Sequence, residues 1–455
     1  MEFARDLFSE LVKWKNGKNR KPLILKGARQ VGKTSLLKLF GKKEFQDVAY
    51  FNFEERPELK SNFQHSKEVN RILQNLSVIH GKKIMPQETL IIFDEIQECN
   101  EALNTLKYFC ENAPEYAIAA AGSLLGITLG NKGGFPVGKV EFLTLYPLTF
   151  HEFLQSKSEK LYHYSKSIGD LMPILDVFFN ELMDLFKIYL ISGGMPEPAK
   201  YMVTTMDISE VQKSLDQIQN SYIMDFSKHN EKNETNKITY VWNSIPSQLA
   251  RENKKFIYQL VKSGARAREF ENSLLWLEQA GMIYRVFLCK KPTHPVSHYD
   301  DLLVFKIYLI DVGLLRMKSR LDPLIFKDDN RLFTEFKGAL TENYILQSLV
   351  NQFETLPRYW KSNSDAEIDF LVEYKNSIIP IEVKSSEHNK SKSLTFYSKQ
   401  FLPGLRIRYS LKNLDYNDGL LSIPIFLADH TRKFIDIALN YKKKGVLKIL
   451  DKYVY

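Results

Sequence analysis

The stretch Gly27-Ala28-Arg29-Gln30-Val31-Gly32-Lys33-Thr34 decides how the N-terminal part of this sequence folds. It matches the pattern GxxxxGK[ST] at every fixed position. An apolar run, Leu23–Leu25, precedes it, and a helical pattern begins at Ser35. Glycines at these positions let backbone N–H groups wrap around phosphate oxygens, and the helix N-terminus adds its dipole. The sequence therefore predicts a nucleotide phosphate loop between a strand and a helix.

ATP and Mg²⁺ are the cofactors that such a loop predicts. Lys33 is expected to bridge the β- and γ-phosphates as a catalytic group, and Thr34 is expected to ligate the metal. The predicted nucleotide-binding residues of the loop are Gly27, Ala28, Arg29, Gln30, Val31, Gly32, Lys33, Thr34 and Ser35.

Two further apolar runs end in polar residues that complete this site. After Thr89–Phe93, Asp94 is predicted to hold the metal through water, and Glu95 to polarise the attacking water. After the run 119–121, Ser123 is placed to contact the γ-phosphate. Together with the loop, these residues predict an ATP hydrolase.

The rhythm of apolar runs divides the chain into four parts. Residues 1–155 alternate strand and helix patterns, as a parallel α/β sheet does. The expected strands are Pro22–Lys26, Val48–Phe53, Thr89–Phe93, Tyr116–Ala121 and Lys139–Thr144. Residues 156–235 read as a helical lid, with one helix over Leu171–Ile191, and residues 236–324 read as a winged helix. In the winged helix, the β-like runs Met282–Leu288 and Phe305–Ile310 follow the helices. Residues 325–455 return to α/β alternation.

A second set of chemically active residues lies in the last part. Asp369 lies on the polar face of one predicted strand, and Glu382 and Lys384 share one face of the next. Glu342 lies on a predicted helix, Gly338–Val350. Carboxylates that converge can bind Mg²⁺, and a neighbouring lysine can activate the water that attacks a phosphodiester. An ordinary amphipathic hairpin fits the same pattern.

The charge balance favours a polyanionic partner. The chain has 63 Lys and Arg against 54 Asp and Glu, a net charge of +9, which points to nucleic acid before a membrane surface. The basic residues of the middle part form a predicted phosphate footprint: Lys254, Lys255, Lys262, Arg266, Arg268, Lys290 and Lys291. Lys390, Lys392 and the run 442–444 could add backbone contacts. A winged helix that packs between subunits, with solvated lysines, remains the alternative.

No disulfide or membrane segment is expected. The three cysteines have neither a metal-binding nor a framework spacing, and no apolar stretch approaches the ~18 residues of a membrane span. A cytoplasmic protein without a membrane partner is therefore predicted.

Several segments resemble the archaeal-type AAA+ ATPases of bacteria and archaea. They are GARQVGKT at 27–34, LIIFDEIQ at 90–97, AAGSL at 120–124, YPLTFHEF at 146–153 and YLISGGMPEP at 189–198. The resemblance implies a homo-oligomer, such as a ring, with Ser123 as sensor 1. Relatives often carry Gly-Arg ahead of the PLTF segment, where this chain has Gly138-Lys139. The arginine that acts across the subunit boundary is therefore unassigned, and the candidates are Arg29, Arg266 and Arg268.

Residues 325–455 resemble PD-(D/E)XK nucleases, most closely the resolvase-like members, although Ile368 stands where the proline of that name would be. This resemblance implies a metal at Glu342, Asp369 and Glu382, a catalytic Lys384, and branched DNA such as a four-way junction as the substrate. Two alternatives stay open. One is an ATP-driven switch whose inactive tail binds DNA, and the other is a protein-remodelling or signalling ATPase.

Overall fold

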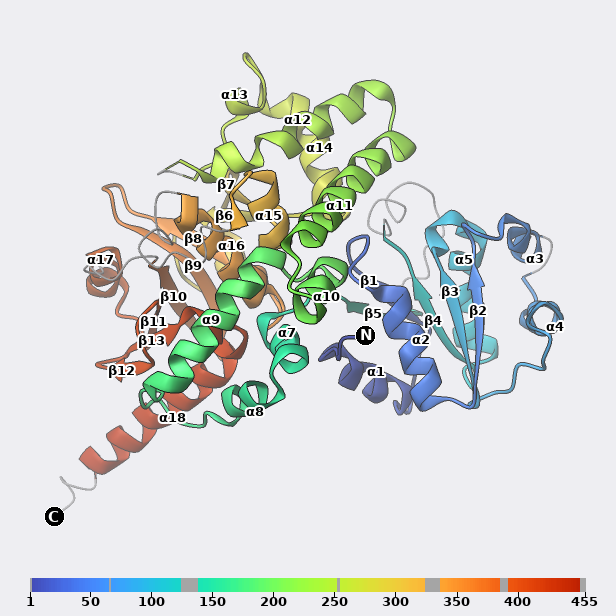
Figure 1. The fold of residues 1–455 in the computed structure, drawn as a ribbon, viewed down its shortest axis with the longest axis horizontal. Helices are drawn as coiled ribbons and strands as arrows, with labels where there is room; N and C mark the ends of the chain where they lie inside the picture. The colour runs from blue at the N-terminus through green and yellow to red at the C-terminus, as the bar shows by residue number, and fades with distance from the viewer. Residues whose placement is uncertain are drawn as a thin grey trace. The chain divides into compact units, whose positions relative to one another are not determined.

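The computed structural model describes residues 2–64, 67–123, 138–251, 254–323, 336–384 and 392–450 (Figure 1). The chain divides into two compact units. Unit 1 consists of Met1–Pro147 with Leu275–Met282, and unit 2 consists of Leu148–Leu274 with Ile283–Tyr455.

A parallel sheet of five strands forms the centre of unit 1, in the order β2-β3-β4-β1-β5. The strands are β1 (Leu23–Lys26), β2 (Asp47–Asn52), β3 (Thr89–Asp94), β4 (Ala117–Ala121) and β5 (Glu141–Thr144). Each predicted strand is confirmed to within two residues at either end. β3 and β4 are buried along their whole length, as strands with both faces covered should be.

Helices cover both faces of this sheet. On one face, Ile91, Phe93 and Ile118 belong to a core that includes side chains of α3, α4 and α5. On the other face α2 packs closely, because a Cβ atom on Gly41 would lie only 2.6 Å from Val48 Cγ2. The helical elements are α1 (Leu7–Lys15), α2 (Lys33–Glu44), η1 (Pro57–Lys60), α3 (Ser61–Gln64), α4 (Val69–His80), η2 (Ile96–Glu98) and α5 (Asn100–Asn112).

Unit 2 begins with a run of helices. They are α7 (Phe150–Lys157), α8 (Glu159–Ser167), α9 (Asp176–Ser192), α10 (Pro196–Thr204), α11 (Ile208–His229), α12 (Lys232–Leu249), α13 (Tyr258–Val261) and α14 (Ala267–Gln279), whose residues from Leu275 on belong to unit 1. The prediction of a helix from Leu171 was wrong at its start, since α9 begins at Asp176. Pro173 explains the delay, because a proline disfavours helical geometry in the residue before it.

The turn after α9 needs both of its glycines. Gly193 has a φ of +67°, and a Cβ atom there would lie 2.2 Å from Asp311 Oδ1. A Cβ atom on Gly194 would lie 2.1 Å from the carbonyl oxygen of Leu148. The Gly194 N–H donates to Asp311 Oδ2 at 2.6 Å, and burial raises the pKa of this carboxyl to about 6. The Ser-Gly-Gly segment thus joins three elements of unit 2 at one buried carboxylate.

A mixed sheet of eight strands carries the rest of unit 2, in the order β12-β13-β11-β10-β9-β8-β6-β7. Its strands are β6 (Ile283–Cys289), β7 (Asp300–Leu309), β8 (Arg358–Lys361), β9 (Glu367–Tyr374), β10 (Ser377–Val383), β11 (Arg406–Ser410), β12 (Asp415–Asn417) and β13 (Leu420–Pro424). Its helical elements are η3 (Val296–Tyr299), α15 (Val312–Lys318), α16 (Phe336–Val350), α17 (Lys392–Phe401), η5 (Ile425–His430) and α18 (Thr431–Leu450).

The hairpin β6–β7 is the edge of this sheet. It joins β8 by one parallel pairing, between Leu288 and Tyr359. Sequence patterns placed the hairpin in a separate winged-helix domain, and the four-part division stays a prediction. In the structure the hairpin and the C-terminal strands form one continuous sheet.

Candidate functional sites

The phosphate loop of unit 1 is held in shape by its own lysine. Lys33 is the first residue of α2, and its Nζ donates to the carbonyl oxygens of Gly27 at 3.0 Å and Ala28 at 2.8 Å. Gly27 and Gly32 have φ angles of +149° and +94°. A Cβ atom on Gly27 would lie 2.3 Å from the carbonyl oxygen of Leu145. Only glycine fits where the loop passes the end of β5.

The Lys33 amino group is buried, with 7% of the residue exposed. Burial lowers its pKa to about 8, although the nearby carboxylates of Glu95 and Asp94 act in the opposite direction. A desolvated ammonium group interacts strongly with an incoming phosphate, because water does not screen it. Of the other predicted loop residues, Ala28 and Val31 are buried, and Gln30 and Ser35 are exposed.

Two hydroxyl groups converge on the carboxylate of Asp94. Thr34 Oγ1 donates to Asp94 Oδ2 at 2.8 Å, and Tyr50 OH donates to the same oxygen at 2.7 Å. The backbone N–H of Glu95 donates to Oδ1 at 3.2 Å. This set of oxygen donors fits Mg²⁺, which proteins bind through one or two carboxylates, waters and substrate phosphates. Thr34 and Asp94 would hold the ion.

Glu95 and Ser123 lie at the carboxyl edge of the same sheet. Glu95 has a left-handed backbone, with φ +49°, and accepts a hydrogen bond of 2.5 Å from Gln97 Nε2. Ser123 follows β4, whose residue Ala121 pairs with Leu25 of β1. The edge therefore gathers the loop, both acids and the serine hydroxyl. Sequence patterns missed the contacts of Tyr50, which is part of no motif, and of Gln97, which ends the segment LIIFDEIQ but was given no role.

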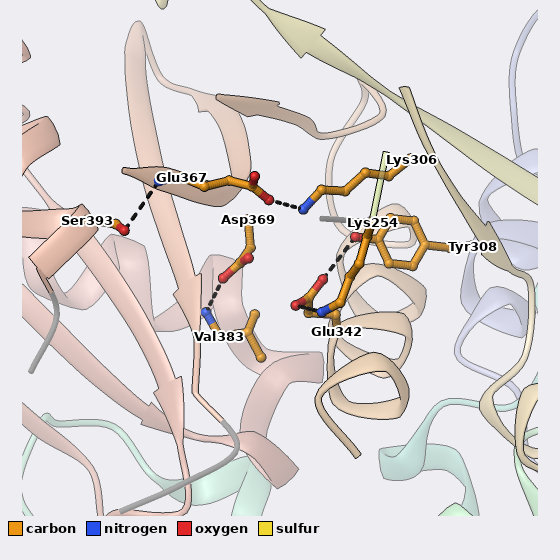
Figure 2. A network of polar contacts seen from close by, with 8 residues as sticks. All are labelled: Lys254, Lys306, Tyr308, Glu342, Glu367, Asp369, Val383 and Ser393. Atoms are coloured by element: carbon orange, nitrogen blue, oxygen red, sulfur yellow. Dashed lines mark hydrogen bonds and ion pairs between the residues drawn. The ribbon is translucent and has the colours of Figure 1, made fainter. Parts of the chain in front are cut away.

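The predicted second site lies in unit 2, where a lysine–carboxylate cluster is found (Figure 2). We use this name for Lys254, Lys306, Glu342, Glu367 and Asp369. Lys254 Nζ forms an ion pair with Glu342 Oε1, and Tyr308 OH donates to Glu342 Oε2 at 3.1 Å. Lys306 Nζ pairs with Glu367 Oε1 at 2.5 Å, and Asp369 Oδ2 accepts the Val383 N–H at 2.8 Å.

Burial controls the electrostatics of the cluster. It raises the pKa of Asp369 to about 7, and the nearby charge of Glu342 adds to this effect. Burial alone would raise the pKa of Glu342, but the charges of Lys254 and Lys306 outweigh this effect and lower it. Burial alone would lower the pKa of Lys306, but the surrounding carboxylates outweigh this effect, so its pKa rises. Lys306 is therefore held as a cation by the carboxylates around it.

The remaining predicted residues, Glu382 and Lys384, contact each other. Lys384 Nζ lies 2.9 Å from Glu382 Oε1, as the shared strand face predicted. Among the described residues, none forms a hydrogen bond with the buried Glu382 Oε2, so this oxygen fits a further ligand. Glu342 does not, because both of its oxygens are already used. Within the described ranges, no group of three His, Cys, Asp or Glu side chains could hold a metal ion. The predicted three-carboxylate set does not fit a metal in this arrangement.

The structure removes one residue from the predicted basic footprint and pairs another with a carboxylate. Lys254 is engaged with Glu342 and drops out of it. Lys290 is exposed but pairs with Asp301 at 3.0 Å. The other members of the footprint are exposed: Lys255, Lys262, Arg266, Arg268 and Lys291. Lys392 is also exposed, whereas Lys390 and the side chains of 442–444 lie outside the described residues.

The position that departs from the resembling family has a local partner. Lys139 Nζ lies 2.9 Å from Glu111 Oε1, and both side chains are 45% exposed. It therefore ends in an ion pair within unit 1. Arg266 and Arg268 remain exposed, beside or within the first turn of α14.

Comparison with family models divides the chain into three matched segments. Residues 19–154 match the AAA domain, so the parallel unit is an AAA domain of the P-loop ATPase type. Residues 183–324 and 337–427 match two domains of unknown function, DUF8612 and DUF4143. No curated protein matches the chain. Within the described ranges, no helix combines the length and apolar character that crossing a bilayer requires.

Several solved structures are similar over a large part of the chain. The Walker-type ATPase PABY2304 of Pyrococcus abyssi is 15% identical, with 70% of this chain and 96% of that chain covered, at a TM-score of 0.43. The Aeropyrum pernix ORC1 protein in complex with DNA is 12% identical, with 70% and 92% covered, at 0.27. The Thermotoga maritima RuvB Holliday junction branch migration motor is 14% identical, with 64% and 90% covered, at 0.28. At these TM-scores, none of them carries an argument about function.

Proposed function

We propose that this chain, whose residues 19–154 are an AAA domain, is a Mg-ATP-hydrolysing ATPase that acts on DNA. The observation that carries the ATPase part is the contact of Thr34 with Asp94 at 2.8 Å, beside Lys33 in the loop. Thr34 and Asp94 hold the metal, Lys33 binds the phosphates, and Ser123 lies at the γ-phosphate. Glu95 then orients and deprotonates the attacking water.

Replacing Glu95 by glutamine is expected to separate binding from hydrolysis. A glutamine keeps the hydrogen-bonding shape but cannot take a proton, and a general base contributes roughly 100- to 10,000-fold in rate. Steady-state phosphate release should therefore fall at least ~100-fold, while equilibrium binding of a fluorescent ATP analogue stays at the wild-type level. Unchanged phosphate release would exclude Glu95 as the base. Glu98, nearby on the following turn η2, gives the matched control Glu98→Gln.

The DNA part of the proposal rests on charge. The chain carries a net charge of +9, and Lys262, Arg266 and Arg268 are exposed near one another in sequence, in and before the first turn of α14. Exposed Lys and Arg side chains release counterions when they contact phosphates. We propose four-way-junction DNA as the preferred substrate and a homo-oligomer as the working form, both from the resemblance stated above.

The double variant Arg266→Ala/Arg268→Ala is expected to weaken DNA binding and its salt dependence together. Each lost phosphate contact lowers the slope of log K against log[salt] by about 0.9, so the slope should fall by up to ~1.8. Mobility shifts over a salt series, with matched linear and four-way-junction DNA, measure this. The control is Lys42→Ala/Lys43→Ala, at two exposed positions of α2. An unchanged slope would remove these arginines from the interface. A wild-type protein that binds ATP but neither DNA would favour the protein-remodelling alternative.

For residues 325–455 the element order supports a nuclease-like fold. Helix α16 is followed by the antiparallel strands β8, β9 and β10, and then by α17 and the parallel strand β11. The lysine–carboxylate cluster favours a second candidate for its role, a tail that binds DNA without cleaving it. Replacing Lys384 by alanine tests this, with cleavage of the junction measured in Mg²⁺. An active nuclease would lose cleavage and keep binding, whereas a binding platform has no cleavage to lose.

A further inference from the structure

We propose that the amino group of Lys254 takes the place of a divalent metal ion at Glu342, so that its removal creates a cation site in unit 2. The inference rests on the nuclease-like reading of residues 325–455 in the proposed function, and it concerns the regulation of that site. Four observations support it.

The first observation is the occupancy of Glu342. This residue is 6% exposed, with Oε1 paired to Lys254 and Oε2 accepting from Tyr308. A carboxylate that binds Mg²⁺ must direct an oxygen at the ion or at one of its waters. Because the protein already uses both oxygens, Glu342 has no oxygen free to bind a metal while Lys254 is paired with it.

The second observation is that the backbone places Lys254. The segment that carries it lies along the edge of β7, where Lys255 forms an antiparallel bridge with Lys306. The Phe256 N–H donates to the carbonyl oxygen of Phe305 at 2.8 Å. The side chain of Lys254 is 14% exposed, so it reaches the cluster from a fixed strand edge. Figure 2 shows its amino group directed at Glu342.

The third observation is that the second lysine is satisfied elsewhere. Lys306 is 1% exposed and pairs with Glu367, a residue outside the predicted metal set. It lies within β7 and is itself the residue bridged to Lys255. Lys254 is therefore the one cation of the cluster that is paired directly with a predicted metal ligand.

The fourth observation is that the carboxyl group of Asp369 remains beside Glu342 once Lys254 is removed. The charge of Glu342 acts on Asp369, and one oxygen of Asp369 accepts the Val383 N–H. One or two carboxylates with waters are enough to hold Mg²⁺ or Mn²⁺ in many proteins. Removing the ammonium group also leaves buried negative charge that a divalent cation can compensate.

The test is Mn²⁺ binding to the full chain without nucleotide, followed by electron paramagnetic resonance of the free ion. Lys254→Ala is expected to gain one Mn²⁺ site that binds at least tenfold more tightly than any site of the wild type. Lys254→Ala/Asp369→Asn should lose that gain, which locates the ion in the cluster. Lys255→Ala, the neighbouring exposed lysine, should bind Mn²⁺ as the wild type does.

Two results would overturn the proposal. One is a wild type that already binds Mn²⁺ as tightly as Lys254→Ala, with the affinity lost in Asp369→Asn. The other is a Lys254→Ala protein with wild-type circular dichroism that gains no site. If this variant fails to fold, Lys254→Gln provides the same measurement with a neutral side chain of similar length. ATP hydrolysis and DNA binding are separate readouts, so failure here leaves the proposed function standing.

Discussion

Replacing Lys33 by alanine is expected to abolish ATP hydrolysis, with a fall of roughly 100-fold or more in turnover. The Lys33 amino group is the buried cation of the phosphate loop and bonds two loop carbonyls. Its removal takes away the charge that binds the β- and γ-phosphates and loosens the loop that surrounds them. Affinity for ATP should fall as well. Phosphate release and calorimetric ATP binding measure the two effects.

Lys42→Ala is the matched control, since Lys42 lies on the same helix and is exposed. It should hydrolyse ATP at the wild-type rate. A Lys33→Ala protein that melts like the wild type and retains hydrolysis would refute the assignment of the catalytic loop. Magnesium removal gives an independent check, because chelation of the ion should stop hydrolysis in the wild type.

The second large effect is expected on stability. Replacing Lys306 by methionine should destabilise unit 2 by about 3–5 kcal/mol, because one partner of a buried ion pair is lost and Glu367 is left without its cation. Lys306 is 1% exposed, and Glu342, Glu367 and Asp369 all act on it. Urea denaturation followed by circular dichroism measures the change in unfolding free energy.

The exposed pair of Lys290 with Asp301 is the matched comparison, on the same hairpin. Lys290→Met should cost less than about 1 kcal/mol, since solvent screens a surface pair. Adding Glu367→Gln to Lys306→Met should restore part of the lost stability, because fewer buried charges remain uncompensated. Equal losses for the two lysine variants would mean that the cluster is not a buried charge network.

The features that the sequence predicted correctly are set by residues that lie close together along the chain. The strands of unit 1 were located within two residues, because strands buried on both faces are continuous apolar runs. The phosphate loop could be recognised because its glycines, Lys33 and Thr34 have a fixed local spacing. The contact of Glu382 with Lys384 followed from the two-residue period of a strand.

The contacts that sequence missed join distant residues. Lys254 appeared as one of several basic residues available to DNA, yet it pairs with Glu342 across 88 positions of chain. Lys306 lies in a segment that matches the resembling family, but neither it nor Tyr50 could be given a role, because their contacts follow from the strands that carry them beside Glu367 and Asp94. The sequence also did not predict that β6 pairs with β8. Periodicity says which face a residue occupies, but not which distant strand lies next to it.

The pairing of β6 with β8 has a consequence for inheritance. Lys306 lies in the segment 183–324 and Glu367 in the segment 337–427, which match two separate family models. The two segments share one sheet and one set of buried charges, so neither can be exchanged freely. A chimera that took the two segments from different relatives would fold only if the residues at positions 306 and 367 could still form an ion pair. The two segments should therefore be inherited together in lineages whose domains recombine.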